Sequence, residues 1–227
     1  MSYIYIFLFS FLIGLLLTFI LRNVGSKYRL FDIAPEDDAL KIHKKPITYL
    51  GGLAMAATTV LVLFFLAIGG VYSGEIFAII LGSIPVFALG FWDDLRWKNI
   101  SQPKPYRKFI CLIIVPLISA FILSLAHIKI SLLGFILVDY LATAFYMFVL
   151  VNSINYEDGI DGLAGGLSLL SIFGFLILSL ITSNELSSLL SLVVAGSICG
   201  FMIFNFPPAK VFMGDSGAFF LGYILCV

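Results

Sequence analysis

Charge, histidine and cysteine are all scarce in this sequence. Only 11% of the 227 residues are charged, against roughly 25% in soluble proteins, whereas 61% are hydrophobic and the mean hydropathy is +1.12. This composition argues against a soluble domain. The three cysteines, Cys111, Cys199 and Cys226, stand singly in apolar segments with no Cys-x-x-Cys or Cys/His spacing. Their isolation gives no support to a disulfide framework or a zinc site.

The sequence contains several long apolar runs. A helix needs roughly 20 residues to cross about 30 Å of hydrocarbon, and none of the runs alternates with the period of two expected of barrel strands. The sequence therefore predicts an all-α polytopic transmembrane helical bundle, about seven complete helices plus a truncated eighth, in a single integral-membrane domain at 1–227. The runs lie at about 3–21, 50–70, 76–92, 109–126, 133–151, 164–182 and 187–204, and the eighth begins near 216.

Lysine and arginine are distributed unevenly between the two sides of this bundle. Six lie in residues 22–49, five in 93–108, none in 152–163 and one in 205–215, whereas the loops on the opposite side carry only Lys129. Cytoplasmic loops of membrane proteins carry an excess of these residues. The bias predicts an N-terminus outside and a cytoplasmic location for the four former loops, in the cell membrane.

Most acidic residues fall on the same predicted cytoplasmic side. The stretch GFWDDLRW places Asp93 and Asp94 at the inner end of the third run, about 100° apart around a helix. Adjacent carboxylates there either coordinate a cation or share a proton; the alternative is a solvated helix end, offset by Arg96 and Lys98. Acidic and basic groups on one membrane face indicate a site for a metal and an anion. Asp139, within the fifth run, is instead predicted to make an interhelical polar contact.

The segment NSINYEDGIDGLAGG follows the fifth run. Its residues Asn152, Asn155 and Asp158 recur every three positions, which places them on neighbouring steps of one helix side. Two Asp-Gly steps then allow a sharp turn, with Asp158 and Asp161 on either side of it. Such steps are also ordinary turn signals, but buried asparagines in the preceding helix are costly without partners. The segment therefore predicts a polar ligand site.

Two further segments are open to two interpretations each. In FNFPPAKVFMGDSGAFFLG, Asp215 and Ser216 either cap the eighth helix or, with free N–H groups, hold an anion and its Mg²⁺. The basic residues of KIHKKPITYLGG precede the second run. Such residues typically set the membrane topology or contact anionic lipids. The alternative is that they bind phosphate.

Four segments match the motifs of one family in order. They are a K-x-H…P…GG loop from Lys41, the Asp93–Asp94 pair, an N-x-x-N-x-x-D-G-x-D-G-L-A-G-G run from Asn152, and an N-x-x-P-A-K-x-F-M-G-D-S-G run from Asn205. In these motifs the chain resembles the polyprenyl-phosphate N-acetylhexosamine-1-phosphate transferases. That family includes undecaprenyl-phosphate GlcNAc-1-phosphate transferases and phospho-MurNAc-pentapeptide translocase. The last two motifs are long and specific, and the match extends over nearly the whole chain.

The resemblance implies an enzyme that transfers a sugar 1-phosphate from a UDP-N-acetylhexosamine, UDP-GlcNAc or a relative, to polyprenyl (undecaprenyl) phosphate. The reaction releases UMP at the cytoplasmic membrane face and serves cell-envelope polysaccharide synthesis. The implied cofactor is Mg²⁺, with Mn²⁺ as an alternative. The implied partners are the membrane, the lipid phosphate and the UDP-sugar, with no nucleic acid; a homodimer is allowed.

The resemblance also implies roles for individual residues. Asp215 is the implied metal ligand, and Asp93 and Asp94 form an acidic pair that acts on the lipid phosphate or the metal. Asp158 is a third implied catalytic carboxylate, in the nucleotide and pyrophosphate pocket. The implied substrate-binding residues are Lys41, His43, Lys108, Asn152, Asn155, Asp161, Asn205 and Phe212.

The chain departs from the family pattern in three respects. Tyr49 stands where many relatives have Arg, and Glu157 stands where an apolar residue is usual. Family members have about ten or eleven helices and a histidine-rich motif in a later cytoplasmic loop, so we expect a chain that lacks its C-terminal helices. Two other classes remain open: an inactive relative that binds lipid phosphate, and an ion or proton transporter, whose acids are expected near mid-membrane in both halves.

Overall fold

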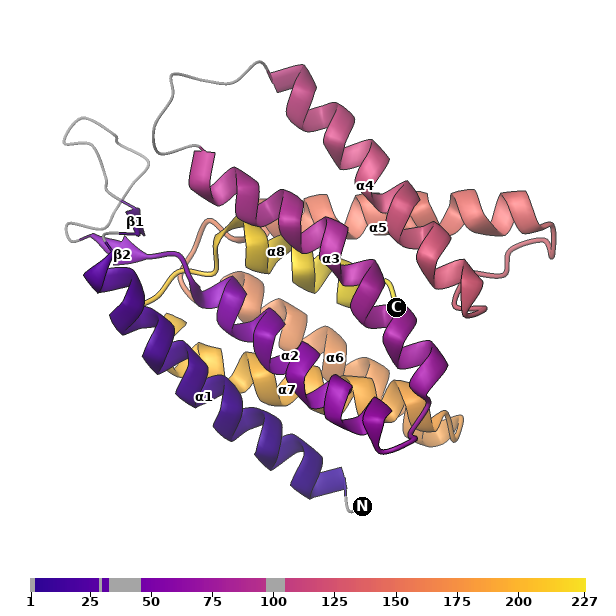
Figure 1. Ribbon diagram of the computed structural model, residues 1–227, viewed down its shortest axis with the longest axis horizontal. Helices are drawn as coiled ribbons and strands as arrows, with labels where there is room; N and C mark the ends of the chain where they lie inside the picture. Colours follow the sequence, from indigo (N-terminus) through magenta and orange to yellow (C-terminus); the bar gives the residue numbers. More distant parts are fainter. Residues whose placement is uncertain (1–2, 29, 33–45, 97–104) are drawn as a thin grey trace.

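The computed structural model describes residues 3–28, 30–32, 46–96 and 105–227, and in these ranges the chain forms eight helices and one two-stranded antiparallel ribbon (Figure 1). The predicted all-α bundle is confirmed, and the small ribbon is an addition to it. The elements are α1 Tyr3–Lys27, β1 Phe31–Asp32, β2 Ile47–Thr48, α2 Gly51–Ile68, α3 Ser73–Arg96, α4 Pro105–Leu125, α5 Ile136–Glu157, α6 Leu163–Ile181, α7 Glu185–Asn205 and α8 Gly214–Ile224.

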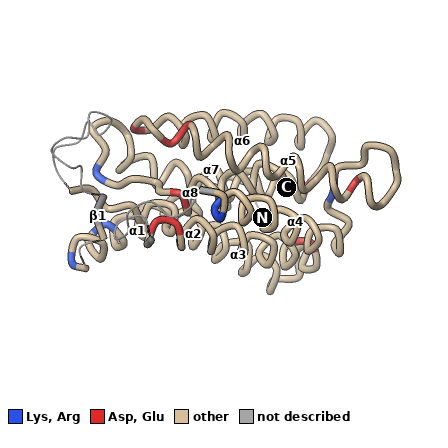
Figure 2. Tube along the Cα trace, turned by 90° about the horizontal axis from the view of Figure 1, so that it is seen from above, with Lys and Arg blue, Asp and Glu red and all other residues tan. Residues whose placement is uncertain are grey.

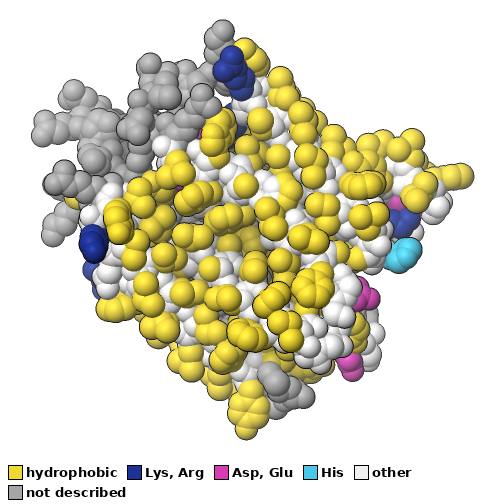
Figure 3. All heavy atoms as spheres, in the orientation of Figure 1, with side chains coloured by type: hydrophobic (Ala, Val, Ile, Leu, Met, Phe, Trp, Pro, Cys, Tyr) yellow, Lys and Arg dark blue, Asp and Glu magenta, His cyan; other side chains and the backbone are white. Residues whose placement is uncertain are grey.

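Seven of the described helices, α1 to α7, are long and apolar enough to cross a membrane. Charged positions gather toward the two ends of the bundle and leave the middle of the helices nearly free of charge (Figure 2). The face seen in Figure 3 is covered by hydrophobic side chains, with charged ones at its edges. A protein in water rarely exposes so large an apolar surface, so this surface fits a hydrocarbon environment.

Three of these helices extend several residues past the C-terminal ends of the apolar stretches that predicted them. Helices α1, α3 and α5 end at Lys27, Arg96 and Glu157, four to six residues later than the predicted ends at 21, 92 and 151. Hydropathy marks only the part of a helix that lies in hydrocarbon, whereas backbone hydrogen bonding continues into the interface. As a result, Asp93 and Asn155 project from helices rather than from loops.

The short helix α8 lies inside the bundle, packed against α2, α3 and α5. From Ser216 to Ile224 all of its residues are buried, and the hydroxyl of Tyr223 donates a hydrogen bond to the Ile79 carbonyl of α3 at 2.8 Å. Because α8 is enclosed by helices on several sides, its first turn has a fixed place at the end of the bundle that carries the ribbon (Figure 1). Helix α1 begins at the opposite end.

Small residues allow α1 and α7 to approach closely. A Cβ atom added at Gly200 of α7 would lie 2.5 Å from the Leu15 nitrogen and 2.8 Å from the Gly14 carbonyl carbon of α1. At Gly196 it would lie 2.6 Å from the Phe7 carbonyl oxygen. These atoms belong to the backbone and cannot turn aside. Close backbone packing of this kind is a common basis for helix association in membranes.

We therefore expect Gly200→Ala to separate α1 from α7 and to lower the free energy of unfolding by about 1–3 kcal/mol, the usual cost of overpacking. Gly174→Ala in α6 is the matched control, because a Cβ at Gly174 meets no atom within 4 Å. Thermal denaturation of both variants in detergent measures the difference. Equal midpoints would contradict this account of the α1–α7 contact.

Asp139 corrects one of the sequence predictions. Its carboxylate is fully buried and accepts hydrogen bonds from Lys129 Nζ at 3.0 Å and from the backbone N–H of Leu132 at 3.0 Å and Leu133 at 3.3 Å. These partners belong to the loop between α4 and α5. The predicted interhelical contact was therefore wrong: the carboxylate lies in the first turn of α5 and holds the loop that leads into it.

Candidate active site

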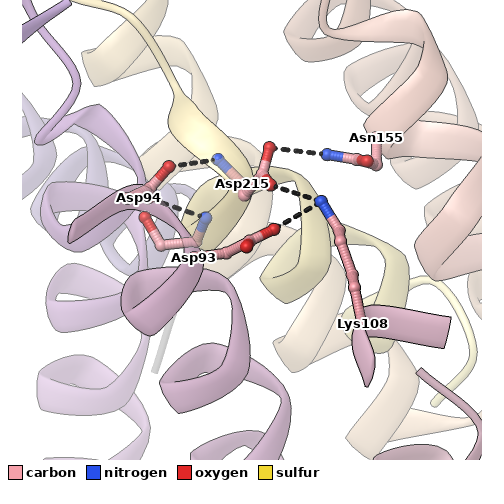
Figure 4. A network of polar contacts seen from close by, with 6 residues as sticks. Asp93, Asp94, Lys108, Asn155 and Asp215 are labelled. Atoms are coloured by element: carbon pink, nitrogen blue, oxygen red, sulfur yellow. Dashed lines mark hydrogen bonds and ion pairs between the residues drawn. The ribbon is translucent and has the colours of Figure 1, made fainter. Parts of the chain in front are cut away.

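Side chains from four helices meet at the ribbon end of the bundle (Figure 4). Asp93 and Asp94 come from the end of α3, Lys108 from the start of α4, Asn155 from the end of α5, and Asp215 from the first turn of α8. Segments more than 100 residues apart in the sequence thus contribute to one cluster. The cluster lies where apolar helices end, which places polar chemistry beside the hydrocarbon region.

Lys108 lies between two carboxylates. Its Nζ forms ion pairs with Asp93 and, at 3.0 Å, with Oδ2 of Asp215. The other oxygen of Asp215 accepts a hydrogen bond from Asn155 Nδ2 at 2.9 Å. Asp93 is almost fully buried, with 4% of its surface exposed, whereas Lys108 and Asp215 keep 27% and 29% of their side chains exposed. The accessible part of the cluster is therefore its Lys108–Asp215 side.

Asp94 points to the backbone of α8 instead. Its Oδ1 accepts a hydrogen bond from the Asp215 N–H at 2.8 Å and its Oδ2 one from the Ser216 N–H at 3.0 Å. The first N–H groups of a helix have no partner within the helix, and Met213, the residue that precedes α8, makes no side-chain cap. Asp94 satisfies these groups from a neighbouring helix.

Asp158 follows α5 and extends the acidic cluster. Burial raises its pKa well above the ordinary range for a carboxyl group, and the charges of Asp215, Asp94 and Asp161 raise it further. Burial also acts to raise the pKa of Asp215, but the hydrogen bond with Asp93 and the charge of Lys108 outweigh it and hold that pKa below its ordinary value. Asp158 is therefore more readily protonated than Asp215.

Two predicted substrate-binding residues are engaged by backbone groups of the neighbouring loops. Asn205 is 3% exposed; its Oδ1 accepts from the Gly162 N–H at 3.0 Å and its Nδ2 donates to the Val211 carbonyl at 2.9 Å. Asp161 accepts from the Ala209 N–H at 2.9 Å. These bonds join the turn after α5 to the loop before α8, and so hold the loop that leads to Asp215.

The Gly-Gly pair that begins α2 joins the same loop from its other side. The Gly51 N–H donates to the Phe212 carbonyl at 3.0 Å and the Gly52 N–H to the Met213 carbonyl at 2.8 Å, while the Phe212 N–H donates to the Thr48 carbonyl at 2.8 Å. The loop thereby continues the ribbon for a short distance. It leaves Phe212 partly buried, three residues before Asp215 in the sequence.

The structure brings together six of the predicted site residues and separates others. The cluster contains Asp93, Asp94, Lys108, Asn155, Asp158 and Asp215. Asn152 bonds within its own helix instead: its Nδ2 donates to the Phe148 carbonyl at 2.7 Å. Lys41 and His43 lie outside the described residues. Tyr49 is buried close to Asp94; burial and that carboxylate raise its pKa.

Sequence reasoning missed two glycines of the site. Gly90 allows α8 to approach α3, because a Cβ there would lie 2.6 Å from the Asp215 carbonyl oxygen. Gly214 has a φ of +72° just before Asp215, a conformation that favours glycine. The spacing of four residues between Gly90 and Asp94 was a signal for the first, since it places both on one helix face.

The carboxylates of the cluster are candidate ligands for the implied Mg²⁺. Within the described ranges no group of three His, Cys, Asp or Glu side chains converges in a way that could hold a metal ion. Mg²⁺ is usually bound by one or two carboxylates together with waters and substrate phosphates, rather than by an all-protein cage. Asp93 and Asp215, which share Lys108, supply this smaller donor set. The residues therefore fit a Mg²⁺ ion that is shared with bound phosphate.

Comparison with known proteins gives several relatives. The chain is 30% identical to a probable undecaprenyl-phosphate N-acetylglucosaminyl 1-phosphate transferase of Bacillus subtilis, over 97% of this chain and 60% of that protein. It is 32% identical to a phospho-N-acetylmuramoyl-pentapeptide-transferase of Limosilactobacillus fermentum, over 67% and 50%. It is also 32% identical to a decaprenyl-phosphate N-acetylglucosaminephosphotransferase of Mycobacterium leprae, over 81% and 50%. The chain thus spans 50–60% of the length of these relatives.

The family profile covers the part of the chain that carries the cluster. The profile of glycosyl transferase family 4 matches residues 76–227, which include Asp93, Lys108, Asn155 and Asp215. The sequence-based resemblance is confirmed by this match, and the seven apolar helices agree with a multi-pass membrane protein. The chain belongs to glycosyl transferase family 4.

Proposed function

We propose that this protein transfers a sugar 1-phosphate from a UDP-N-acetylhexosamine to a polyprenyl phosphate such as undecaprenyl phosphate. The observation that carries the proposal is the convergence of Asp93, Lys108, Asn155 and Asp215 at one end of an apolar bundle. A lipid phosphate and a water-soluble nucleotide can both reach such a boundary. The relatives from B. subtilis and M. leprae are named for the transfer of N-acetylglucosamine 1-phosphate to undecaprenyl and decaprenyl phosphate.

The reaction forms one phosphorus–oxygen bond and breaks another. An oxygen of the lipid phosphate attacks the phosphorus that carries the sugar, and the bond from that phosphorus to the UMP phosphate breaks, so UMP leaves with the electron pair. A phosphate monoester has a second pKa near 6 and is mostly dianionic at neutral pH. The attacking oxygen therefore needs little help from a general base. The larger difficulty is the approach of two multiply charged anions.

The side chains of the cluster can reduce this repulsion between the two anions. Lys108 supplies a cation next to Asp215, and its ammonium group can turn toward a phosphate. We assign Asp215, with Asp93 as the second carboxylate, to the Mg²⁺ ion, which supplies charge neutralisation when bound. Asn155 orients Asp215 through its amide. We assign Asp158 to the pyrophosphate of the nucleotide sugar and Phe212 to its uridine.

The proposal includes an orientation. Twelve of the thirteen Lys and Arg residues fall in the sequence segments 22–49, 93–108 and 205–215. This bias favours a cytoplasmic active site. UDP-sugars are then available on the same side as the cluster. The N-terminus lies on the opposite side of the membrane in this arrangement.

The test is release of UMP from UDP-GlcNAc by purified protein in detergent with undecaprenyl phosphate. It uses the 227-residue chain and, in parallel, the gene product with any residues encoded after Val227. We expect UMP release that requires the lipid phosphate and stops when EDTA is added. A panel of UDP-sugars that includes UDP-MurNAc-pentapeptide identifies the donor.

Two results would contradict the proposed function. Absence of UMP release from every UDP-sugar of the panel would exclude the transferase. Ion or proton uptake into vesicles that does not depend on nucleotide would instead identify a transporter.

A further inference from the structure

The two adjacent aspartates of α3 have different kinds of partner. Asp93 pairs with the Lys108 side chain, which also contacts Asp215. Asp94 accepts hydrogen bonds from two backbone N–H groups, those of Asp215 at 2.8 Å and Ser216 at 3.0 Å. Figure 4 shows the Asp94 carboxylate pointing to the backbone of the first turn of α8 and the Asp93 carboxylate pointing to Lys108. Their different partners indicate different functions.

The face of α3 that carries Asp94 has glycines where α8 packs against it. Gly82, Val86, Gly90 and Asp94 follow one another at intervals of four residues, so they lie on one side of the helix. A Cβ at Gly82 would lie 2.5 Å from the Tyr223 hydroxyl, and one at Gly90 would lie 2.7 Å from the Ser216 Cα. The close approach brings the first turn of α8 within hydrogen-bonding distance of Asp94.

Gly214, the residue before Asp215, lies directly against the Asp94 carboxylate. A Cβ added at Gly214 would lie 2.8 Å from Oδ2 and 2.9 Å from Oδ1 of Asp94, and 3.0 Å from the Tyr49 carbonyl oxygen. The backbone therefore passes Asp94 at a distance that leaves no room for a side chain. Asp94 is enclosed by backbone on the side that faces α8.

We propose that Asp94 is a positioning residue, which anchors the first turn of α8 so that the Asp215 carboxylate stays between Lys108 and Asn155. In this role Asp94 neither accepts a proton from substrate nor ligates the metal, in contrast to the catalytic role that the family resemblance implies. The inference deepens the proposed function and rests on it for its catalytic part.

The test compares four variants: Asp94→Asn, Asp94→Ala, Asp93→Asn and Asp93→Ala. Asparagine keeps one acceptor oxygen and is as good a helix cap as aspartate, whereas alanine removes both hydrogen bonds. We expect Asp94→Asn to keep kcat within about tenfold of the unaltered protein with the same pH profile, and Asp94→Ala to lose about 10²-fold. A proton-transferring carboxylate typically contributes about 10²–10⁴-fold, and asparagine cannot replace it.

Hydrogen exchange gives a readout that does not depend on activity. A helix end that loses its anchor opens more often, and exchange rates report that opening. We expect the peptide that covers residues 214–220 to exchange about tenfold faster in Asp94→Ala, with a smaller increase in Asp94→Asn, and to change little in Asp93→Ala. If none of the proteins releases UMP, the proposed function fails but the exchange result still tests the anchor.

Two outcomes would overturn the positioning role. One is an Asp94→Asn variant as inactive as Asp94→Ala, with a pH profile that has lost one limb. The other is unchanged exchange of residues 214–220 in Asp94→Ala. If Asp94→Ala does not fold, the kcat, the pH profile and the exchange rate of Asp94→Asn decide the question by the same criteria.

Discussion

Replacement of Asp215 by asparagine is expected to lower the rate of UMP release by about 10²–10³-fold, the usual cost of removing one group that stabilises a developing charge. The side chain would keep its size but lose its negative charge and one of its two acceptor oxygens. It could then accept a hydrogen bond from only one of Asn155 and Lys108, which now donate to different oxygens at 2.9 Å and 3.0 Å. Affinity for Mg²⁺ should therefore fall together with kcat, because the ion prefers charged oxygen ligands. Initial rates over a Mg²⁺ titration measure both effects.

Asp139→Asn is the matched control for this substitution. Asp139 also lies 3.0 Å from a lysine, but at the other end of the bundle, so its replacement should affect stability and leave the Mg²⁺ requirement and kcat of the folded protein unchanged. Equal loss of activity in the two variants would mean that general destabilisation, not the chemistry of Asp215, causes the effect.

Replacement of Lys108 by methionine is expected to destabilise the protein by about 1–3 kcal/mol in the presence of EDTA. Loss of one partner of a buried ion pair costs about 3–5 kcal/mol, and the partial exposure of Lys108 and Asp215 reduces this cost because solvent screens the remaining charges. The variant leaves Asp93 and Asp215 close together without the ammonium group. Added Mg²⁺ should restore at least half of the lost stability, since a cation can then neutralise the two carboxylates.

Lys129→Met provides the control for the lysine substitution. Lys129 is 26% exposed and lies 3.0 Å from Asp139, much as Lys108, which is 27% exposed, lies 3.0 Å from Asp215. The control should lose stability without a response to Mg²⁺, because it leaves one carboxylate without its lysine rather than two adjacent carboxylates. Thermal denaturation in EDTA and in Mg²⁺ distinguishes the cases. Restoration of both variants, or of neither, would contradict a cation site at Asp93 and Asp215.

The family and the general position of the site could be predicted from local sequence patterns. The run from Asn152 and the run from Asn205 are long enough to identify the family, and the order of the motifs pointed to one site. The individual contacts were not accessible in this way. Asn205 was assigned to substrate through the family resemblance, whereas its amide holds two backbone groups of neighbouring loops. A motif indicates that a residue is needed without specifying its hydrogen-bond partners.

The sequence by itself determined that this is a bundle of apolar helices, because hydropathy is a property of local segments. Its charge bias predicts which side of the membrane the charged loops face. Only the tertiary structure decided the roles of neighbouring side chains. Asp93 and Asp94 are adjacent in sequence, yet a rotation of about 100° around the helix directs one to Lys108 and the other to the backbone of α8. The α8 backbone lies 121 residues further along the chain from Asp94, so this distinction depends on how the helices pack.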